Sequence, residues 1–204
     1  NSFGMPQFYV NHQGRRLCTI QLAIPGEHNI LNALAAFACC HSLGVEVDDM
    51  VETLERYTGT QRRFDVIGIT SDNIQIVDDY AHHPTEIKAS LTAAAHYPHK
   101  ELWCVFQPHT YTRTKALFRD FIDALTLADH VVLADIYAAR ETDTLGISSR
   151  DIADALKEND CDAYYFATFE EIEDFCLDKC HKGDLLITMG AGDVVNIGEN
   201  ILKK

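Results

Sequence analysis

The sequence predicts an α/β protein: a doubly wound, mainly parallel sheet that follows a smaller α/β segment. Three observations predict this fold class. The chain has 204 residues, of which 47% are hydrophobic and 24% charged, as in packed proteins. Beyond residue 60, short apolar runs alternate with segments of helical spacing. Polar residues gather where these apolar runs end.

The first 60 residues predict two strands joined by a turn, and then two helices. The predicted elements are Gln7–Asn11, Cys18–Ile24, His28–Leu43 and Asp48–Tyr57. The turn is expected in His12–Arg16, around Gly14, and Gly44 is expected to stop the first helix. That helix carries one apolar stripe, made of Ile30, Leu31, Leu34, Phe37 and Ala38. Thr58–Gly59–Thr60 interrupts the pattern, and we expect a domain boundary there.

The remaining residues predict strands and helices in alternation. Five short apolar strands are predicted: Ile74–Val77, Leu102–Phe106, His130–Ala134, Ala163–Ala167 and Asp184–Met189. The predicted helices are Thr85–His96, Thr114–Ala128, Ser149–Glu158, Phe169–Cys180 and Asp193–Leu202. Asp65–Thr70 is expected to form an extra strand, hairpinned onto the first, and Ser148–Ser149 to cap a helix. Five β–α units in succession imply a doubly wound sheet.

Polar runs follow four of these strands, and ligands of open parallel sheets bind beyond the carboxyl ends of the strands. The runs are Asp78–Pro84, Gln107–Arg113, Asp135–Glu141 and Gly190–Asp193. Arg113 and Arg140 offer forked donors that suit carboxylate or phosphate. His82, His83 and His109 could bind a metal, transfer protons or donate hydrogen bonds to phosphate oxygens. The sequence therefore predicts a polar site at this edge.

Two further patterns leave alternatives open. In Gly190–Ala191–Gly192, the next glycine comes too late for GxGxxG, so the run predicts a tight turn or a close approach of backbone amides to a ligand. Cys176 and Cys180 lie one helical turn apart, with His181 beside them. Without a CxxC pair, a core or surface face is favoured over a zinc site.

Two polar pairs near the domain boundary are equally open. Asn29 and Asn32 share a helix face, so their amides could pair with the edge of an adenine, or one of them could cap the helix. Arg62 and Arg63 could be a solvated pair or a phosphate clamp.

Charge and cysteine content exclude several classes of function. Seventeen basic and 31 acidic residues give a net charge of −14, which argues against sequence-independent nucleic-acid binding. No apolar run has the length of a membrane span. Seven cysteines, of which Cys39 and Cys40 are adjacent, rule out a complete disulfide framework and favour a reducing cytoplasm. The chain starts at Asn1 rather than Met, as a piece of a longer protein would.

Six motifs, read together, resemble the Mur ligase family in order and spacing: PGEHNILNALAA, TGTQRRFD, DDYAHHPTEI, FQPHTYTRT, DIYAARE and GAGD. The resemblance extends from about Gly26 to the end of the chain. It implies that residues 1–60 are a remnant of a central ATP-binding domain and that residues 61–204 are a Rossmann-like C-terminal domain. Because GxxxxGK[ST] is absent, we expect the UDP-binding domain, the P-loop and the magnesium ligands to lie upstream.

The resemblance also implies a reaction. HHPTEI and FQPHTYTRT are similar to the members that join L-alanine to UDP-N-acetylmuramate, using ATP and magnesium, through an acyl phosphate. The chain alone is expected to be inactive. One alternative is a related ligase that adds a preformed peptide to the same muramate. Another is a non-catalytic nucleotide-binding module of flavodoxin-like type.

Residue by residue, the resemblance implies a set of roles and no metal ligand. His28, Asn29 and Asn32 match the positions at the adenine, Arg63 the arginine at the ATP phosphates, and Asp79 the acid at the ribose. The substrate end would be met by Tyr80, His82, His83, His109, Arg113 and Arg140. Of these, His82 and Arg113 would be catalytic. Thr110 stands where the motif often has an arginine.

Overall fold

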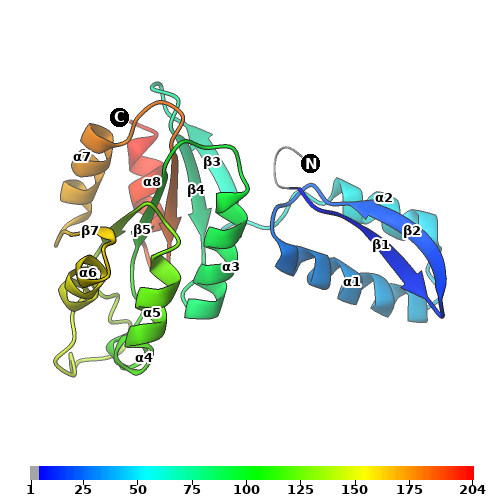
Figure 1. The fold of residues 1–204 in the computed structure, drawn as a ribbon, viewed down its shortest axis with the longest axis horizontal. Coiled ribbons are helices and arrows are strands. Elements are labelled where there is room, and N and C mark those ends of the chain that lie inside the picture. Colours follow the sequence, from blue (N-terminus) through cyan, green and yellow to red (C-terminus); the bar gives the residue numbers. More distant parts are fainter. Residues whose placement is uncertain (1–4) are drawn as a thin grey trace. The chain divides into compact units, whose positions relative to one another are not determined.

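The computed structural model describes residues 5–204 as two compact units (Figure 1). The first unit contains the described residues up to Thr60 together with Thr92–Pro98. The second contains Gln61–Leu91 and His99–Lys204. Each unit is described by itself below. No helix among residues 5–204 combines the length and the apolar character that crossing a membrane requires.

The first unit begins with an antiparallel hairpin of β1 (Gln7–His12) and β2 (Arg15–Gln21). Gln13 and Gly14 form its two-residue turn, with φ of 49° and 77°. Two successive positive φ values match the right-handed twist of paired strands. The prediction of a second strand over Cys18–Ile24 starts three residues too late, because so short a turn lets pairing resume at once.

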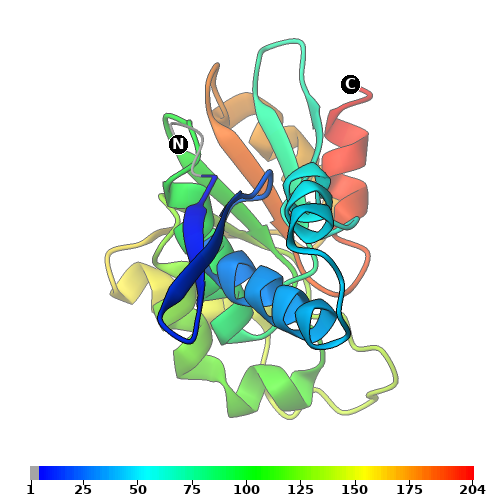
Figure 2. The same ribbon diagram turned by 90° about the vertical axis from the view of Figure 1, so that its right-hand side faces the viewer.

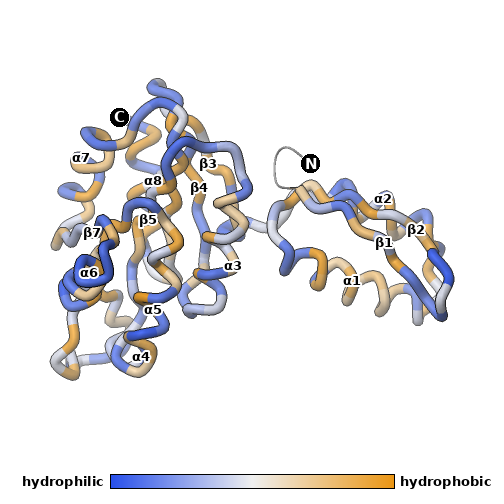
Figure 3. Tube along the Cα trace, in the orientation of Figure 1, coloured by the Kyte–Doolittle hydropathy of each residue, from blue (hydrophilic) through white to orange (hydrophobic). Residues whose placement is uncertain are grey.

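Helices α1 (Glu27–Ser42) and α2 (Val47–Arg56) lie against the hairpin (Figures 1 and 2). The buried core of this unit consists of Val10, Ile20, Leu22, Ala33, Phe37 and Met50. The predicted stripe of α1 is partly wrong. Although α1 is hydrophobic along much of its length (Figure 3), Leu31 and Leu34 are 66% and 40% exposed. The positions that face the core are Ala33 and Phe37, one turn apart.

The second unit contains a six-stranded sheet in the order β3-β4-β8-β5-β6-β7. Strand β3 (Asp65–Ile69) pairs antiparallel with β4, and all other pairs are parallel. The parallel strands are β4 (Gln75–Asp79), β5 (Leu102–Phe106), β6 (His130–Leu133), β7 (Asp162–Tyr165) and β8 (Leu185–Met189). The predicted doubly wound, mainly parallel sheet and its extra hairpin strand are confirmed.

Helices cover both faces of the sheet (Figure 1). They are α3 (Pro84–Ala95), α4 (Tyr111–Ala116), α5 (Phe118–Leu125), α6 (Ser149–Glu158), α7 (Phe169–Lys179) and α8 (Val195–Ile201). Helices α7 and α8 pack with Ile76, Val105 and Leu186 in one core cluster. On the other face, the ring of Phe121 from α5 lies 5.5 Å from that of Phe106.

Two helix predictions have clear outcomes. The single helix predicted over Thr114–Ala128 is wrong: α4 ends and α5 begins around Leu117, whose φ of −111° and ψ of 23° are not helical. The cap at Ser148 is confirmed, because its side chain accepts a hydrogen bond from the backbone N–H of Asp151. Cys176 and Cys180 are buried in the core cluster, as the favoured interpretation expected.

Candidate functional site

The carboxyl ends of β4, β8, β5 and β6 meet at one edge of the sheet because these strands are parallel neighbours. The loops that carry Asp79, His109 and Arg140 therefore leave the same edge, as the sequence predicted. An isolated parallel bridge between His109 and Tyr137 ties two of these loops together. The backbone N–H of Thr110 donates to the Tyr137 carbonyl over 2.9 Å.

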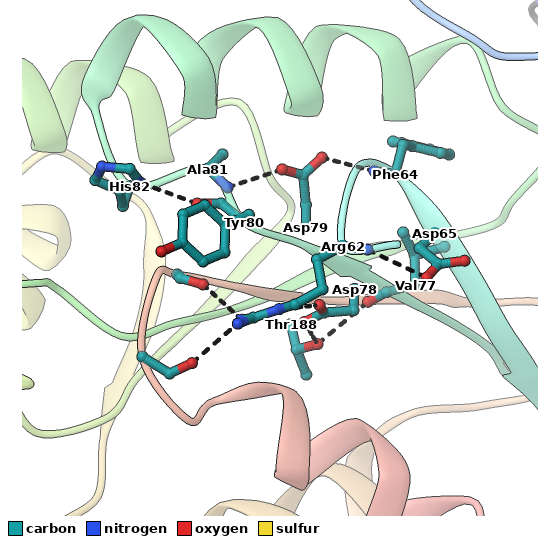
Figure 4. A network of polar contacts seen from close by, with 12 residues as sticks. Arg62, Phe64, Asp65, Val77, Asp78, Asp79, Tyr80, Ala81, His82 and Thr188 are labelled. Carbon is teal, nitrogen blue, oxygen red and sulfur yellow. Dashed lines mark hydrogen bonds and ion pairs between the residues drawn. The ribbon is translucent and has the colours of Figure 1, made fainter. Parts of the chain in front are cut away.

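Asp79, the last residue of β4, is 3% exposed and organises the start of its loop (Figure 4). Its Oδ1 accepts a hydrogen bond from the N–H of Ala81 over 2.8 Å. Its Oδ2 accepts from the N–H of Phe64 over 3.0 Å and from the Ser90 hydroxyl over 2.9 Å. Burial raises the pKa of Asp79, and these hydrogen bonds oppose the shift. Asp79 thus joins the segment before β3 to the end of β4 and to α3.

Aromatic and imidazole rings form a row along this edge. Neighbouring ring centroids lie 5.4 Å apart for Tyr80 and His82, 6.0 Å for His82 and His109, and 5.4 Å for His109 and Tyr137. The last two rings are stacked, with 19° between their planes. Arg113, on α4, brings its Nη1 to 3.5 Å from the Nδ1 of His109. Three of the predicted substrate residues, with Arg113, are therefore brought together.

When His82 and His109 are neutral, their hydrogen bonds place the proton on Nδ1 of His82 but on Nε2 of His109. Nδ1 of His82 lies 3.0 Å from the carbonyl of Tyr80, so it carries the proton and leaves Nε2 as an acceptor. Nδ1 of His109 faces the Arg113 guanidinium and must accept, which leaves Nε2–H as a donor. Burial, and then the charges of Arg113 and His82, lower the pKa of His109.

Three other predicted residues of this unit, Arg63, His83 and Arg140, are exposed. The N–H groups of His82 and His83 both donate to Oε2 of Glu86, over 3.1 and 3.3 Å, which fixes the loop at the start of α3.

The turn after β8 needs its glycines for space. A Cβ at Gly190 would lie 2.8 Å from the backbone oxygen of Gln107, and φ at Gly190 is 151°. A Cβ at Gly192 would clash with Oε1 of Gln107 and lie 2.9 Å from the Tyr137 ring. This packing accounts for both glycines as parts of a tight turn, and the close approach of backbone amides to a ligand stays a prediction.

The first unit contains a separate pocket of about 630 Å³. Asn29 and Asn32 line it, with residues that include Leu22, Ile24 and Tyr57. The Nδ2 of Asn29 donates to the Pro25 carbonyl over 2.7 Å, and the Nδ2 of Asn32 donates to Oδ1 of Asn29 over 3.2 Å. The two amides share a face, as predicted. His28 is exposed and is not among the lining residues.

The contacts of Tyr137 and Arg62 at the site were not predicted from the sequence, which left Arg62 open as half of a solvated pair or of a phosphate clamp with Arg63. Tyr137 follows the end of β6, inside a run that the sequence did flag, and an aromatic residue at such a position is the only signal. Arg62 forms an ion pair with Asp78, in which its Nε lies 2.9 Å from Oδ2 (Figure 4). Burial raises the pKa of Asp78, and Arg62 opposes the shift.

Comparison with known proteins defines the class. The family described as "Mur ligase, glutamate ligase domain" matches residues 62–192. This match covers more than half of the chain, and the chain therefore belongs to the Mur ligase family.

Particular members of this family are similar over the whole chain. A UDP-N-acetylmuramate–L-alanine ligase of Lachnoclostridium phytofermentans is 54% identical over 204 residues, which are 100% of this chain and 43% of that protein. Another, of Agathobacter rectalis, is 55% identical over 197 residues, 97% of this chain and 43% of that protein. The crystal structure of UDP-N-acetylmuramate–alanine ligase of Thermotoga maritima aligns with a TM-score of 0.82 and 31% identity, covering 98% of this chain and 43% of that one. This chain thus spans less than half the length of the relatives it matches.

Proposed function

We propose that this chain is the carboxy-terminal part of an ATP-dependent ligase that joins L-alanine to UDP-N-acetylmuramate in peptidoglycan precursor synthesis in the cytoplasm. The observation that carries the proposal is the 54% identity with such a ligase along all 204 residues. The gathering of His82, His109 and Arg113 at one edge of the sheet supports it. In this proposal, the UDP pocket and the magnesium ligands belong to the rest of the protein. Among residues 5–204, no group of three or more metal-binding side chains is placed to hold an ion.

The residues proposed for ATP have donors and acceptors that fit its parts. Asn32 can pair with the adenine edge, since one of its N–H groups and its oxygen are not used by the bond to Asn29. Oδ1 of Asp79 accepts one protein hydrogen bond and can take another from a ribose hydroxyl, whereas Oδ2 already accepts two. Arg63 is exposed and offers a fork to phosphate oxygens. His28 is proposed to lie near the adenine.

Bound ATP supplies the phosphoryl group that activates the muramyl carboxylate. The protein side chains then position the reactants and balance charge. Arg113 and the Nε2–H of His109 would stabilise the negative charge of the tetrahedral intermediate. Nε2 of His82, an acceptor, would take a proton from the attacking amine of L-alanine. Tyr80, His83 and Arg140 would contact the substrate.

The test uses a protein of the relatives' full length that ends in this sequence. Phosphate release from ATP is measured with UDP-N-acetylmuramate and, in turn, L-alanine, L-serine, glycine and a preformed peptide. We expect the highest kcat/KM with L-alanine. A preference for the peptide would favour the related peptide ligase, and no phosphate release with any acceptor would favour a non-catalytic nucleotide-binding module.

A second measurement concerns the 204-residue chain by itself. We expect this chain, separated from the phosphate-binding loop and the metal ligands of the whole protein, to bind ATP only in the millimolar range, a binding free energy of about −4 kcal/mol. We also expect it to release no phosphate. Calorimetry with ATP–magnesium checks this. Micromolar affinity would mean that the residues named above bind ATP without help from the rest of the protein.

A further inference from the structure

Two adjacent arginines open the sheet unit, and their environments differ. Arg63 is exposed, with its guanidinium carbon 5.7 Å from the centroid of the Tyr80 ring. The side chain of Arg62 is only 28% exposed, and its Nε and Nη2 both donate hydrogen bonds within the protein. The proposed function gives a role to Arg63 alone, so the contacts of Arg62 remain to be explained.

The guanidinium of Arg62 joins the ends of two neighbouring strands (Figure 4). Its Nε donates to Oδ2 of Asp78, on β4, over 2.9 Å. Its Nη2 donates to the carbonyls of Gly190 and Gly192, over 2.8 and 3.2 Å, in the turn that follows β8. The far oxygen of Asp78 accepts from the hydroxyl of Thr188, on β8, over 2.8 Å. One planar fork therefore fixes both the strand end and the turn.

The backbone around Arg62 is held in an unusual conformation. Arg62 and Phe64 have φ values of 59° and 47°, in the left-handed region that non-glycine residues rarely adopt. Their contacts hold this shape. The Arg62 carbonyl accepts from the N–H of Tyr80 over 2.7 Å, and the Phe64 N–H donates to Asp79 over 3.0 Å. Arg63 lies between two residues that are both anchored to the end of β4.

We propose that Arg62 is a positioning residue for ATP: its fork holds Arg63 and the Gly190–Gly192 turn in one fixed arrangement at the edge of the sheet. The inference rests on the proposed function, in which Arg63 contacts the ATP phosphates. Arg62 itself does not touch ATP. Loss of Arg62 would remove its contacts with Asp78, with the Gly190–Gly192 turn and with the Tyr80 ring, whose centroid lies 4.9 Å from its guanidinium carbon. His82, His109 and Arg113 are held by contacts of their own, so the expected consequence is selective: ATP use is disturbed while these three residues keep their place.

Kinetics on the full-length ligase test this inference. For Arg62→Gln and Arg62→Lys, we expect KM for ATP to rise at least tenfold while KM for L-alanine stays within twofold. Lysine retains the charge beside Asp78, which preserves the fold, but its ammonium cannot reproduce the planar fork. Arg119→Gln, which removes an exposed arginine on α5, is the matched control and should change neither constant. A KM for ATP within twofold of the parent in Arg62→Lys would overturn the inference.

A second readout is independent of activity. In the 204-residue chain, the carbonyl ¹³C shifts of Gly190 and Gly192 and the amide shift of Arg63 should change with Arg62→Lys and not with Arg119→Gln. Unchanged shifts would show that Arg62 does not hold the turn. If the parent ligase releases no phosphate with any acceptor, the proposed function fails, whereas this measurement still decides whether the arrangement exists.

Discussion

Two histidines at opposite edges of the same sheet have opposite pKa shifts. His109 lies beyond the carboxyl end of β5, beside Arg113, and its pKa is lowered by burial and by that positive neighbour. His130 begins β6 at the amino edge. Its Nδ1 lies 2.6 Å from Asp162, its Nε2 lies 3.0 Å from Glu101, and its ring stacks on Trp103 at 3.9 Å. Burial alone would lower the pKa of His130, but the two carboxylates outweigh it and raise the pKa.

This difference distinguishes the carboxyl edge, which we call the binding edge, from the amino edge, which we call the structural edge. At the amino edge, each ring nitrogen of His130 has an acid partner, so the histidine is satisfied within the protein. At the carboxyl edge, the charged group in contact with His109 is the Arg113 cation, and its effect on the pKa of His109 is larger than the opposing effect of Glu141. Such an arrangement becomes more favourable when an anion binds beside it. A carboxylate or phosphate is therefore the kind of group that would complete the carboxyl edge.

The largest expected effect is on catalysis at the carboxyl edge. In the full-length ligase, Arg113→Ala should lower kcat/KM by about 3–4 kcal/mol of transition-state stabilisation, the scale for loss of one preorganised donor. Arg113→Lys should recover little, because an ammonium cannot present the fork. The matched change at the amino edge, His130→Gln, should leave kcat/KM within about twofold. Near-normal kcat/KM in Arg113→Ala would make Arg113 an ordinary surface charge.

The next effect is on stability. Asp79→Ala should lower the free energy of unfolding by about 3 kcal/mol, since it leaves the N–H groups of Phe64 and Ala81 and the Ser90 hydroxyl without an acceptor. Urea unfolding of the 204-residue chain measures this. Ser90→Ala removes only one of these bonds and should cost about 1 kcal/mol. Equal losses in the two variants would contradict the role of Asp79 as the centre of the network.

The sequence predicted the sheet well where burial is complete. The prediction for β5 matches Leu102–Phe106, and that for β8 differs by one residue, because both strands are buried along their whole length. The sequence-based prediction was wrong where tertiary packing determines which side chains are buried. Leu31 and Leu34 are as apolar as any core residue, yet the hairpin covers only the face that carries Ala33 and Phe37. The break between α4 and α5 at Leu117 could not be predicted, because no glycine or proline stands there.

For the site, the sequence predicted which loops meet but not which side chains hold them together. Strand order and parallel pairing bring the loops to one edge, and apolar periodicity is enough to infer that. The bonds of Arg62 to Gly190 and Gly192 join residues 128 and 130 positions apart, and no local pattern encodes such pairs. The same holds for Tyr137, whose stacking on His109 depends on two loops at once.

A smaller, pH-dependent effect belongs to the amino edge. Because folding raises the pKa of His130, its charge stabilises the fold fully below the unfolded pKa of about 6.5, and this contribution is lost as pH rises through the folded pKa. His130→Gln should therefore destabilise the chain by about 1 kcal/mol at pH 6 and by much less at pH 9. Urea unfolding at the two pH values tests this, and an equal loss at both would mean that stacking on Trp103, not charge, is what matters.

The smallest effects are on the two pKa values themselves, and they test the comparison most directly. In the parent chain, His130 should titrate above 6.5 and His109 below it, as followed through the imidazole Cε1–Hε1 signals in NMR. Arg113→Gln removes the cation beside His109 and should raise the pKa of His109 without moving that of His130. Glu101→Gln should lower the pKa of His130 and leave His109 unchanged, because each histidine responds to the charges at its own edge. Were both histidines to move with either substitution, the charges of the two edges would be coupled through the sheet, and the separation of a binding edge from a structural edge would not hold.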